Sequence, residues 1–126
     1  MKYLLDTTIL VDHVNGYSAA EQELERLFSD ATQLYTCGVV TCEALSSGTP
    51  EERRHISVLL DALEYVSIDP DAARWAATSR REGRAKPGAR SLADALIAAV
   101  AWRLDATIVT RNVRDFERQG VPVRTY

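Results

Sequence analysis

The chain is poor in cysteine and histidine, and these two shortages restrict the chemistry open to it. Its 126 residues include 2 Cys, Cys37 and Cys42, and 2 His, His13 and His55. Two cysteines give no disulfide framework, and the four residues together show no zinc-binding spacing. We therefore expect reduced, structural thiols and no zinc centre.

Long apolar runs are also missing. No stretch approaches the roughly 20 apolar residues that span a bilayer, and the start Met-Lys-Tyr-Leu-Leu-Asp reaches an acid before a signal-peptide core can form. With 6 Gly, 4 Pro, 46% hydrophobic and 26% charged residues, the composition is globular rather than disordered or collagen-like. We expect one domain over residues 1–126, located in the cytoplasm and without membrane contact.

The net charge of −3 hides an asymmetry between the two halves of the chain. Residues 1–73 hold 4 bases against 13 acids, whereas residues 74–126 hold 11 bases against 5 acids. The densest basic stretch, from Arg80 to Arg90, contains Gly and Pro, which predicts a flexible loop able to follow a phosphate backbone. A solvated charged loop without a partner is the competing interpretation.

Short apolar segments alternate with helical patterns along the whole chain. We expect strands at residues 2–5, 33–36, 65–68, 107–109 and 121–124. Helices are expected at residues 9–14, 18–28, 39–45, 49–63, 69–81, 91–104 and 112–119. This order predicts an α/β domain whose central parallel sheet has four to five short strands flanked by helices, with ligands beyond the carboxyl ends of the strands.

Three of the expected helices carry start signals. Ser18 with Glu21 and Thr49 with Glu52 have the spacing of a capping box, and Ser91 precedes another apolar helix. The apolar spacing of the first of these helices predicts that its core-facing residues are Leu24, Leu27 and Phe28.

Four acidic residues lie where the pattern does not call for charge. Asp6 directly follows the first strand, Glu43 lies inside a short apolar helix, and Asp94 interrupts a longer one. Asp115 follows the fourth strand on a helical turn. A capping role would also explain Asp94, and an arginine partner would explain Asp115. The remaining acids that we considered are interpreted as exposed faces or helix starts: Asp12, Asp61, Asp69 and Asp71.

Carboxylates that converge where the dielectric constant is low repel one another, so they require bound protons or a cation. Oxygen ligands from Asp and Glu, with Thr and Asn nearby, suit Mg²⁺ or Mn²⁺ rather than Zn²⁺. Hard cations held by a few carboxylates are typical of sites that perform in-line displacement at a phosphodiester. The pattern therefore indicates a metal site with phosphodiester chemistry.

Four blocks of the sequence resemble the PIN-domain family and, more narrowly, its VapC-type toxins of type II toxin–antitoxin systems. The blocks are Leu-Leu-Asp-Thr-Thr-Ile-Leu at 4–10, Glu43, Ser-Leu-Ala-Asp-Ala-Leu-Ile-Ala-Ala at 91–99, and Val-Thr-Arg-Asn-Val-Arg-Asp-Phe at 109–116. They occur in order and cover essentially the whole chain.

The resemblance implies an Mg²⁺- or Mn²⁺-dependent endoribonuclease that inhibits translation or growth until a VapB-type antitoxin neutralises it. It also implies a homodimer, and hydrolysis of RNA by a metal-activated water. By position, it assigns the acidic metal-site residues as Asp6, Glu43, Asp94 and Asp115, and the supporting residues as Thr8, Thr110 and Asn112. Basic residues expected along the RNA backbone are Arg80, Arg81, Arg84, Lys86, Arg90, Arg111 and Arg114.

Several points stay open at this level. Thr7 is an alternative to Thr8 as the supporting hydroxyl, and the sequence does not give the RNA, its cleavage site, the antitoxin or the number of metal ions. A non-catalytic module that holds a structural ion is one alternative function. A phosphoacceptor receiver domain is a weaker one, because that chemistry uses a lysine late in the chain, and the only lysines are Lys2 and Lys86.

Overall fold

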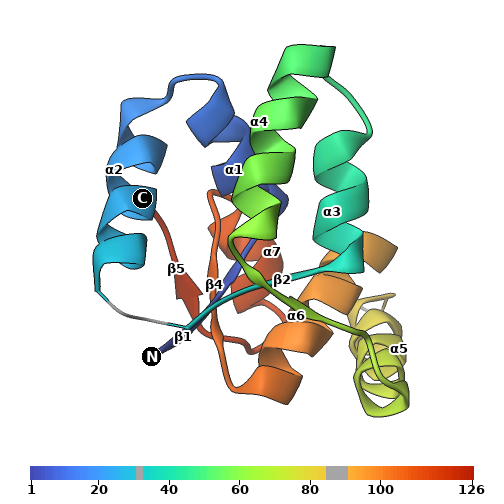
Figure 1. Ribbon diagram of the computed structural model, residues 1–126. Coiled ribbons are helices and arrows are strands. Elements are labelled where there is room, and N and C mark those ends of the chain that lie inside the picture. The colour runs from blue at the N-terminus through green and yellow to red at the C-terminus, as the bar shows by residue number, and fades with distance from the viewer. Residues whose placement is uncertain (31–32, 85–90) are drawn as a thin grey trace.

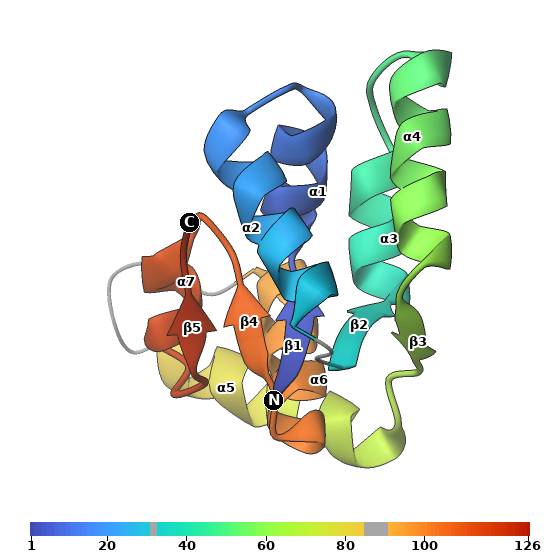
Figure 2. The same ribbon diagram turned by 60° about the vertical axis from the view of Figure 1, so that its left-hand side comes forward.

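The computed structural model describes residues 1–30, 33–84 and 91–126, and in this part of the chain five parallel strands form one sheet. The strands are β1 (Lys2–Leu5), β2 (Gln33–Cys37), β3 (Glu64–Val66), β4 (Thr107–Val109) and β5 (Val123–Arg124). Their order is β3-β2-β1-β4-β5, which Figure 2 shows from right to left. The predicted single α/β domain with a central parallel sheet is confirmed.

Helices surround this sheet (Figure 1). They are α1 (Thr7–Val14), α2 (Ser18–Ser29), α3 (Gly38–Leu45), α4 (Pro50–Asp61), α5 (Pro70–Arg84), α6 (Leu92–Leu104) and α7 (Val113–Glu117). Helix α1 contacts α2, α3 and α4, whereas α5 and α6 pack on each other and lie behind the strands in Figure 2. None of the helices in the described residues has the length and apolar character needed to cross a membrane.

The central strand β1 and its neighbour β4 are buried on both faces, as expected for a parallel sheet covered by helices. Leu4 and Leu5 of β1 and Ile108 and Val109 of β4 have no exposed surface. An apolar run of three or four residues is enough to form each of these strands, because the strands are short and neither face meets water. The sheet therefore holds the ends of β1 and β4 in fixed positions at the centre of the molecule.

A seam of alanines places α6 against α5. Ala72 and Ala76 on α5 meet Ala95 and Ala99 on α6, and all four are buried. The four-residue spacing puts each pair on one helix face, and the small side chains let the two backbones approach closely. This packing fixes the amino-terminal turn of α6, which carries Asp94.

The strand order creates a switch point beside β1. After β1, β2 and β3 have been laid down on one side, the chain returns through α5 and α6 to place β4 on the other side of β1. Ligands of open parallel sheets bind at such switch points, outside the carboxyl ends of the strands. The backbone N–H of Asp6 donates to the carbonyl of Val109 at 3.0 Å, so the residues following the two strands lie side by side.

Two of the three predicted helix caps are confirmed. The Thr49 hydroxyl accepts a hydrogen bond from the Glu52 backbone N–H at 3.1 Å, and the Ser91 hydroxyl accepts one from the Asp94 N–H at 3.0 Å. The predicted capping box at Ser18 is wrong. Tyr17 occupies the cap position of α2 and makes no side-chain capping bond, so Ser18 is already the first helical residue.

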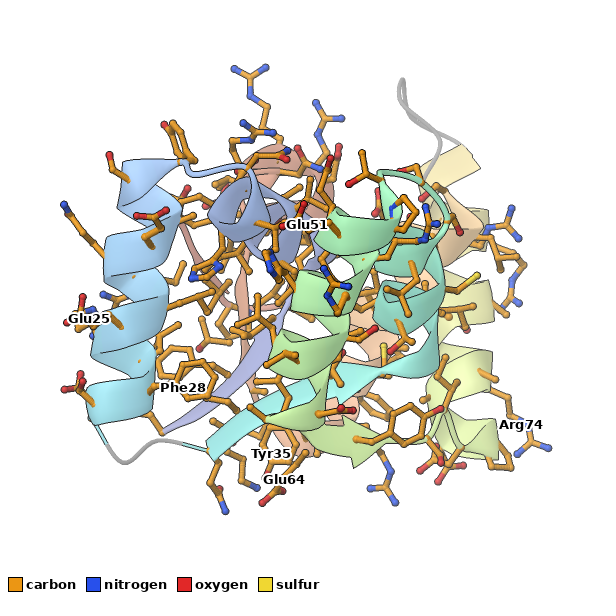
Figure 3. The ribbon with its side chains drawn as sticks, turned by 45° about the horizontal axis from the view of Figure 1, so that its top comes forward. Glu25, Phe28, Tyr35, Glu51, Glu64 and Arg74 are labelled. Carbon is orange, nitrogen blue, oxygen red and sulfur yellow. The ribbon has the colours of Figure 1, made fainter. Side chains whose placement is uncertain are left out.

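The prediction that Phe28 faces the core is also wrong. Phe28, labelled in Figure 3, is 44% exposed, whereas Leu24 and Leu27 on the same helix are buried as predicted. The apolar stripe of α2 is narrow because Ala20 and Glu23 share its buried face, and Phe28 lies beyond the edge of that stripe.

The predicted basic loop begins later than expected. Arg80, Arg81 and Arg84 belong to α5, which continues to Arg84 because Ala, Arg and Glu are good helix formers. Arg81 donates to the Thr78 hydroxyl at 3.2 Å on the exposed helix surface. The two other predicted members of this stretch, Lys86 and Arg90, lie outside the described residues.

The caps give a matched pair of stability predictions. Thr49→Ala removes a bond to an otherwise unpaired N–H of α4 and should lower the free energy of unfolding by about 1 kcal/mol. Ser18→Ala should leave it within about 0.5 kcal/mol, as for ordinary surface changes. Urea denaturation of both variants measures the difference, and an equal loss in the two would contradict the cap assignment.

Candidate active site

Asp6 is the most buried acid at the carboxyl edge of the sheet. It directly follows β1 and is only 3% exposed. Its Oδ2 accepts a hydrogen bond from the Thr110 hydroxyl at 2.7 Å, and its carboxylate also accepts from the Thr7 backbone N–H. Thr110 directly follows β4 and is fully buried, so the switch point brings these two residues together.

Hydroxyl groups tie the segment after β4 to this carboxylate. The Thr8 hydroxyl lies 3.4 Å from Asp6 Oδ2 and 3.3 Å from the Thr110 hydroxyl. It accepts the Arg111 backbone N–H at 3.0 Å, and the Thr110 hydroxyl accepts that of Asn112 at 3.0 Å. Thr8, Thr110 and the Asn112 backbone are thus gathered around Asp6, while the Asn112 side chain is exposed and does not cap α7.

Glu43 reaches the same region from α3. Its side chain is exposed, in contrast to the interior position that its apolar helix suggested. The Thr7 hydroxyl donates to Glu43 Oε1 at 3.0 Å. The two adjacent threonines therefore have different partners: Thr7 holds Glu43, and Thr8 lies beside Asp6.

Asp94 and Asp115 come from α6 and α7. Asp94 is half-buried in the first turn of α6, where its backbone N–H donates to Ser91 and its carboxylate also bonds to the Ser91 side chain. Asp115 is exposed in the first turn of α7. The four predicted acids therefore come from the end of β1 and from α3, α6 and α7, elements that Figure 1 labels.

The charges of these acids are coupled. Burial raises the pKa of Asp6, the hydrogen bonds from Thr110 and Thr7 lower it, and the nearby Asp94 and Glu43 charges raise it further. Burial also raises the pKa of Asp94, against the Ser91 hydrogen bond, and the charges of Asp115 and Glu43 add to the rise. Each of the four carboxylates thus acts on at least one of the others, as expected if they face one region.

The donor set fits a hard divalent cation. The groups around Asp6 are carboxylates and threonine hydroxyls, and oxygen is the ligand atom that Mg²⁺ and Mn²⁺ prefer. His and Cys ligands are typical of Zn²⁺ or softer ions instead. Within the described ranges, no three His, Cys, Asp or Glu side chains are arranged closely enough to hold one ion. Mg²⁺ usually keeps several waters and takes only one or two protein carboxylates, so this looser arrangement suits it.

Two of the predicted basic residues lie beside Asp115. Arg111 and Arg114 line a surface hollow of about 400 Å³ together with Asn112, Val113 and Asp115. Arg80 and Arg81 lie on α5 instead, and Arg80 is half-buried. One further acid was not predicted to matter: Asp12, interpreted from the sequence as part of an exposed face or a helix start, is only 7% exposed and pairs with Arg111.

Comparison with known proteins decides the family. The PIN domain model matches residues 3–121. The chain belongs to the PIN-domain family. Ribonuclease VapC19 of Mycobacterium tuberculosis is 32% identical over 113 residues, which are 90% of this chain and 90% of that protein. Ribonuclease VapC11 of the same organism is 34% identical over 121 residues, covering 90% of this chain and 88% of that protein.

Solved structures show the same PIN-domain architecture. VapBC2 from Rickettsia felis, bound to a DNA fragment from its promoter, has a TM-score of 0.84 at 22% identity and covers 99% of this chain and 98% of that one. A toxin–antitoxin complex from Klebsiella pneumoniae has a TM-score of 0.76 at 28% identity, covering 98% and 96%. The resemblance to VapC-type members of the PIN-domain family is confirmed.

The raised pKa of Asp94 gives a stability prediction. Ionising a carboxyl whose folded-state pKa exceeds its ordinary value of 3.8 opposes folding, so stability falls as pH rises from the ordinary pKa through the raised one. Asp94→Asn should therefore leave the melting temperature in metal-free buffer at pH 7 unchanged or raise it, despite losing a helix-dipole interaction of about 0.3–1 kcal/mol.

Asp71→Asn is the matched control, because Asp71 is an exposed acid in the first turn of α5. It should lower the melting temperature slightly through the same dipole effect. Added Mg²⁺ should stabilise the wild type by mass action and Asp94→Asn less. A clear drop for Asp94→Asn without metal would assign Asp94 to helix capping alone.

Proposed function

We propose that this protein is an Mg²⁺- or Mn²⁺-dependent endoribonuclease that acts as the toxin of a VapBC-type toxin–antitoxin system. The observation that carries the proposal is the placement of acids at the switch point of the sheet, where the Thr110 hydroxyl donates to the buried Asp6 and the adjacent Thr7 donates to Glu43. Relatives named ribonucleases, at 32% and 34% identity over most of the chain, support RNA as the substrate.

Asp6 and Asp94 would hold the metal, with Glu43 and Asp115 able to complete the site. Such an ion supplies positive charge to the phosphate and makes a water molecule available as the nucleophile. The protein's own part is to orient these carboxylates. Thr110 donates a hydrogen bond to Asp6, which favours the charged form of that carboxylate, and Thr7 donates one to Glu43, which holds its side chain in place.

Arg111 and Arg114, on the segment after β4, would bind the RNA backbone beside the acids. Phosphate contacts of this kind increase affinity without reading the base sequence. Arg80 and Arg81, on α5 and farther from the acids, would extend the contact along the RNA chain.

The solved relatives suggest how the activity is controlled. Several are toxin–antitoxin complexes, including VapBC proteins from Rickettsia felis and Salmonella typhimurium and a complex from Klebsiella pneumoniae. A VapB-type antitoxin would bind this chain as well and block RNA cleavage, and the active toxin would be a homodimer. Free toxin would then inhibit translation or growth.

Cleavage of RNA by the purified protein tests this function. Asp94→Asn should reduce the rate with Mg²⁺ or Mn²⁺ by more than about 100-fold, because even changes to groups that only support metal ligands cost about 10- to 100-fold. Asp71→Asn, which removes an acid from the first turn of another helix, should retain the wild-type rate.

Single changes of Asp6, Glu43 and Asp115 to the matching amide complete the test. Full activity in all four variants would contradict the enzyme and favour a non-catalytic module that holds a structural ion. Mapping the 5′ ends of cellular RNA after expression, with and without Asp6→Asn, would identify the RNA and the cleavage site.

A further inference from the structure

Asp12 is a buried acid that the proposed metal site does not use. It lies on α1, six residues beyond Asp6, and is only 7% exposed. A carboxylate removed from water in this way is costly unless it is paired and hydrogen-bonded. The identity of its partners therefore indicates what its burial achieves.

The two partners of Asp12 come from the last 16 residues of the chain, and each uses a different oxygen. The Tyr126 hydroxyl donates to Asp12 Oδ2 at 2.6 Å. The Arg111 Nη2 atom lies 3.4 Å from Asp12 Oδ1, with 58% of the arginine side chain exposed. Asp12 thus joins a half-buried tyrosine contact on one side to an exposed guanidinium group on the other.

Arg111 is fixed at two points relative to the acidic site. Its backbone N–H donates to the Thr8 hydroxyl at 3.0 Å, and Thr8 lies beside Asp6. Its side chain is held by Asp12 and lines the surface hollow that also includes Asp115. One amino group of the guanidinium, Nη2, lies beside the Asp12 carboxylate, and the large exposed fraction of the side chain leaves its other N–H donors accessible to an anion.

We propose that Asp12 and Tyr126 are positioning residues that hold the Arg111 guanidinium at the rim of the acidic site, where it binds an RNA phosphate next to the bond that is cleaved. The proposal rests on the proposed ribonuclease function and names the phosphate contact that orients the substrate. Arginine held in place before binding loses less side-chain freedom when it contacts phosphate, and this raises affinity.

Tyr126 completes the arrangement because it occupies the second oxygen of Asp12. Without its hydroxyl, that oxygen would need another donor, and Arg111 would turn inward to supply it. Burial, followed by the hydrogen bond to Asp12, raises the pKa of Tyr126, so the phenol remains a donor over the pH range of an RNA cleavage assay.

A merely structural role is the competing interpretation, in which Asp12 ties the segment around Tyr126 to α1 and Arg111 is incidental. The two interpretations differ in whether Asp12 acts through Arg111. A double-mutant cycle separates them, because residues that act as a unit show non-additive effects whereas independent residues do not.

The test measures the Kd of a fluorescent single-stranded RNA in EDTA at several salt concentrations, and KM and kcat with Mn²⁺. Arg111→Ala should weaken binding about tenfold and reduce the salt slope of log Kd by about 0.7, the value for one phosphate contact on single-stranded RNA. Asp12→Asn and Tyr126→Phe should each weaken binding about threefold through lost pre-organisation. The change should be in KM rather than in kcat.

In the Arg111→Ala background, Asp12→Asn and Tyr126→Phe should weaken binding no further. Equal losses with and without Arg111, or unchanged RNA binding with a lower melting temperature, would overturn the positioning role. Tyr126→Phe carries the test alone if Asp12→Asn does not fold.

Two controls match these changes. Tyr17→Phe alters the tyrosine whose ring meets that of Tyr126 edge-on, with centroids 6.4 Å apart, and should leave Kd unchanged. Arg103→Ala breaks a comparable pair, with 2.8 Å between Arg103 Nε and Asp69 Oδ2 and 53% of the arginine side chain exposed. Arg103 lies near the opposite end of α6 from Asp94, about 14 Å along the helix, so this variant should also bind RNA normally.

The design separates the two proposals. A wild-type protein that binds RNA but does not cleave it would overturn the ribonuclease function alone, because the coupling between Asp12 and Arg111 would still be read from Kd. A wild-type protein that neither binds nor cleaves RNA would overturn both.

Discussion

The burial of one carboxylate at the junction of two central strands governs the rest of this structure. Asp6 is 3% exposed, and its principal hydrogen bond comes from Thr110, 104 positions later in the sequence. The contact exists only because β1 and β4 lie side by side, with Asp6 N–H bonded to the Val109 carbonyl. The sheet order therefore determines where the buried acid lies. The surrounding helices bring further acidic side chains to the same end of the sheet.

This arrangement opposes the stability of the metal-free protein. Burial and the charges of Glu43 and Asp94 raise the pKa of Asp6, while a short hydrogen bond from Thr110 holds the ionised form. A bound cation removes the conflict, because it replaces repulsion among the acids with attraction to each of them. Fold and proposed function are connected at this point, because the proposed metal would compensate for charges that the fold alone would not favour. A further buried acid, Asp12, needs no metal because Tyr126 and Arg111 already satisfy it.

The sequence predicts most of what depends on neighbouring residues. The strand and helix order follows from short apolar runs and caps such as Thr49, and the isolated acids indicate the candidate site. Prediction from the sequence fails where contacts between distant residues determine whether a side chain is buried. Asp12 is buried because Tyr126, 114 positions away, bonds to it, and no local pattern contains that contact. Phe28 is exposed because the core closes over a narrower stripe of α2 than its apolar residues suggest, and Glu43 is exposed on an otherwise apolar helix.

The central claim is that the carboxylates of separate elements share a divalent ion at the carboxyl edge of the sheet. Anomalous X-ray diffraction from crystals soaked in Mn²⁺ tests it most directly, because the signal locates manganese without assumptions about ligands. The account predicts a manganese peak in contact with oxygens of Asp6 and Asp94. Manganese bound elsewhere, or no peak at these two residues in saturating Mn²⁺, would contradict it.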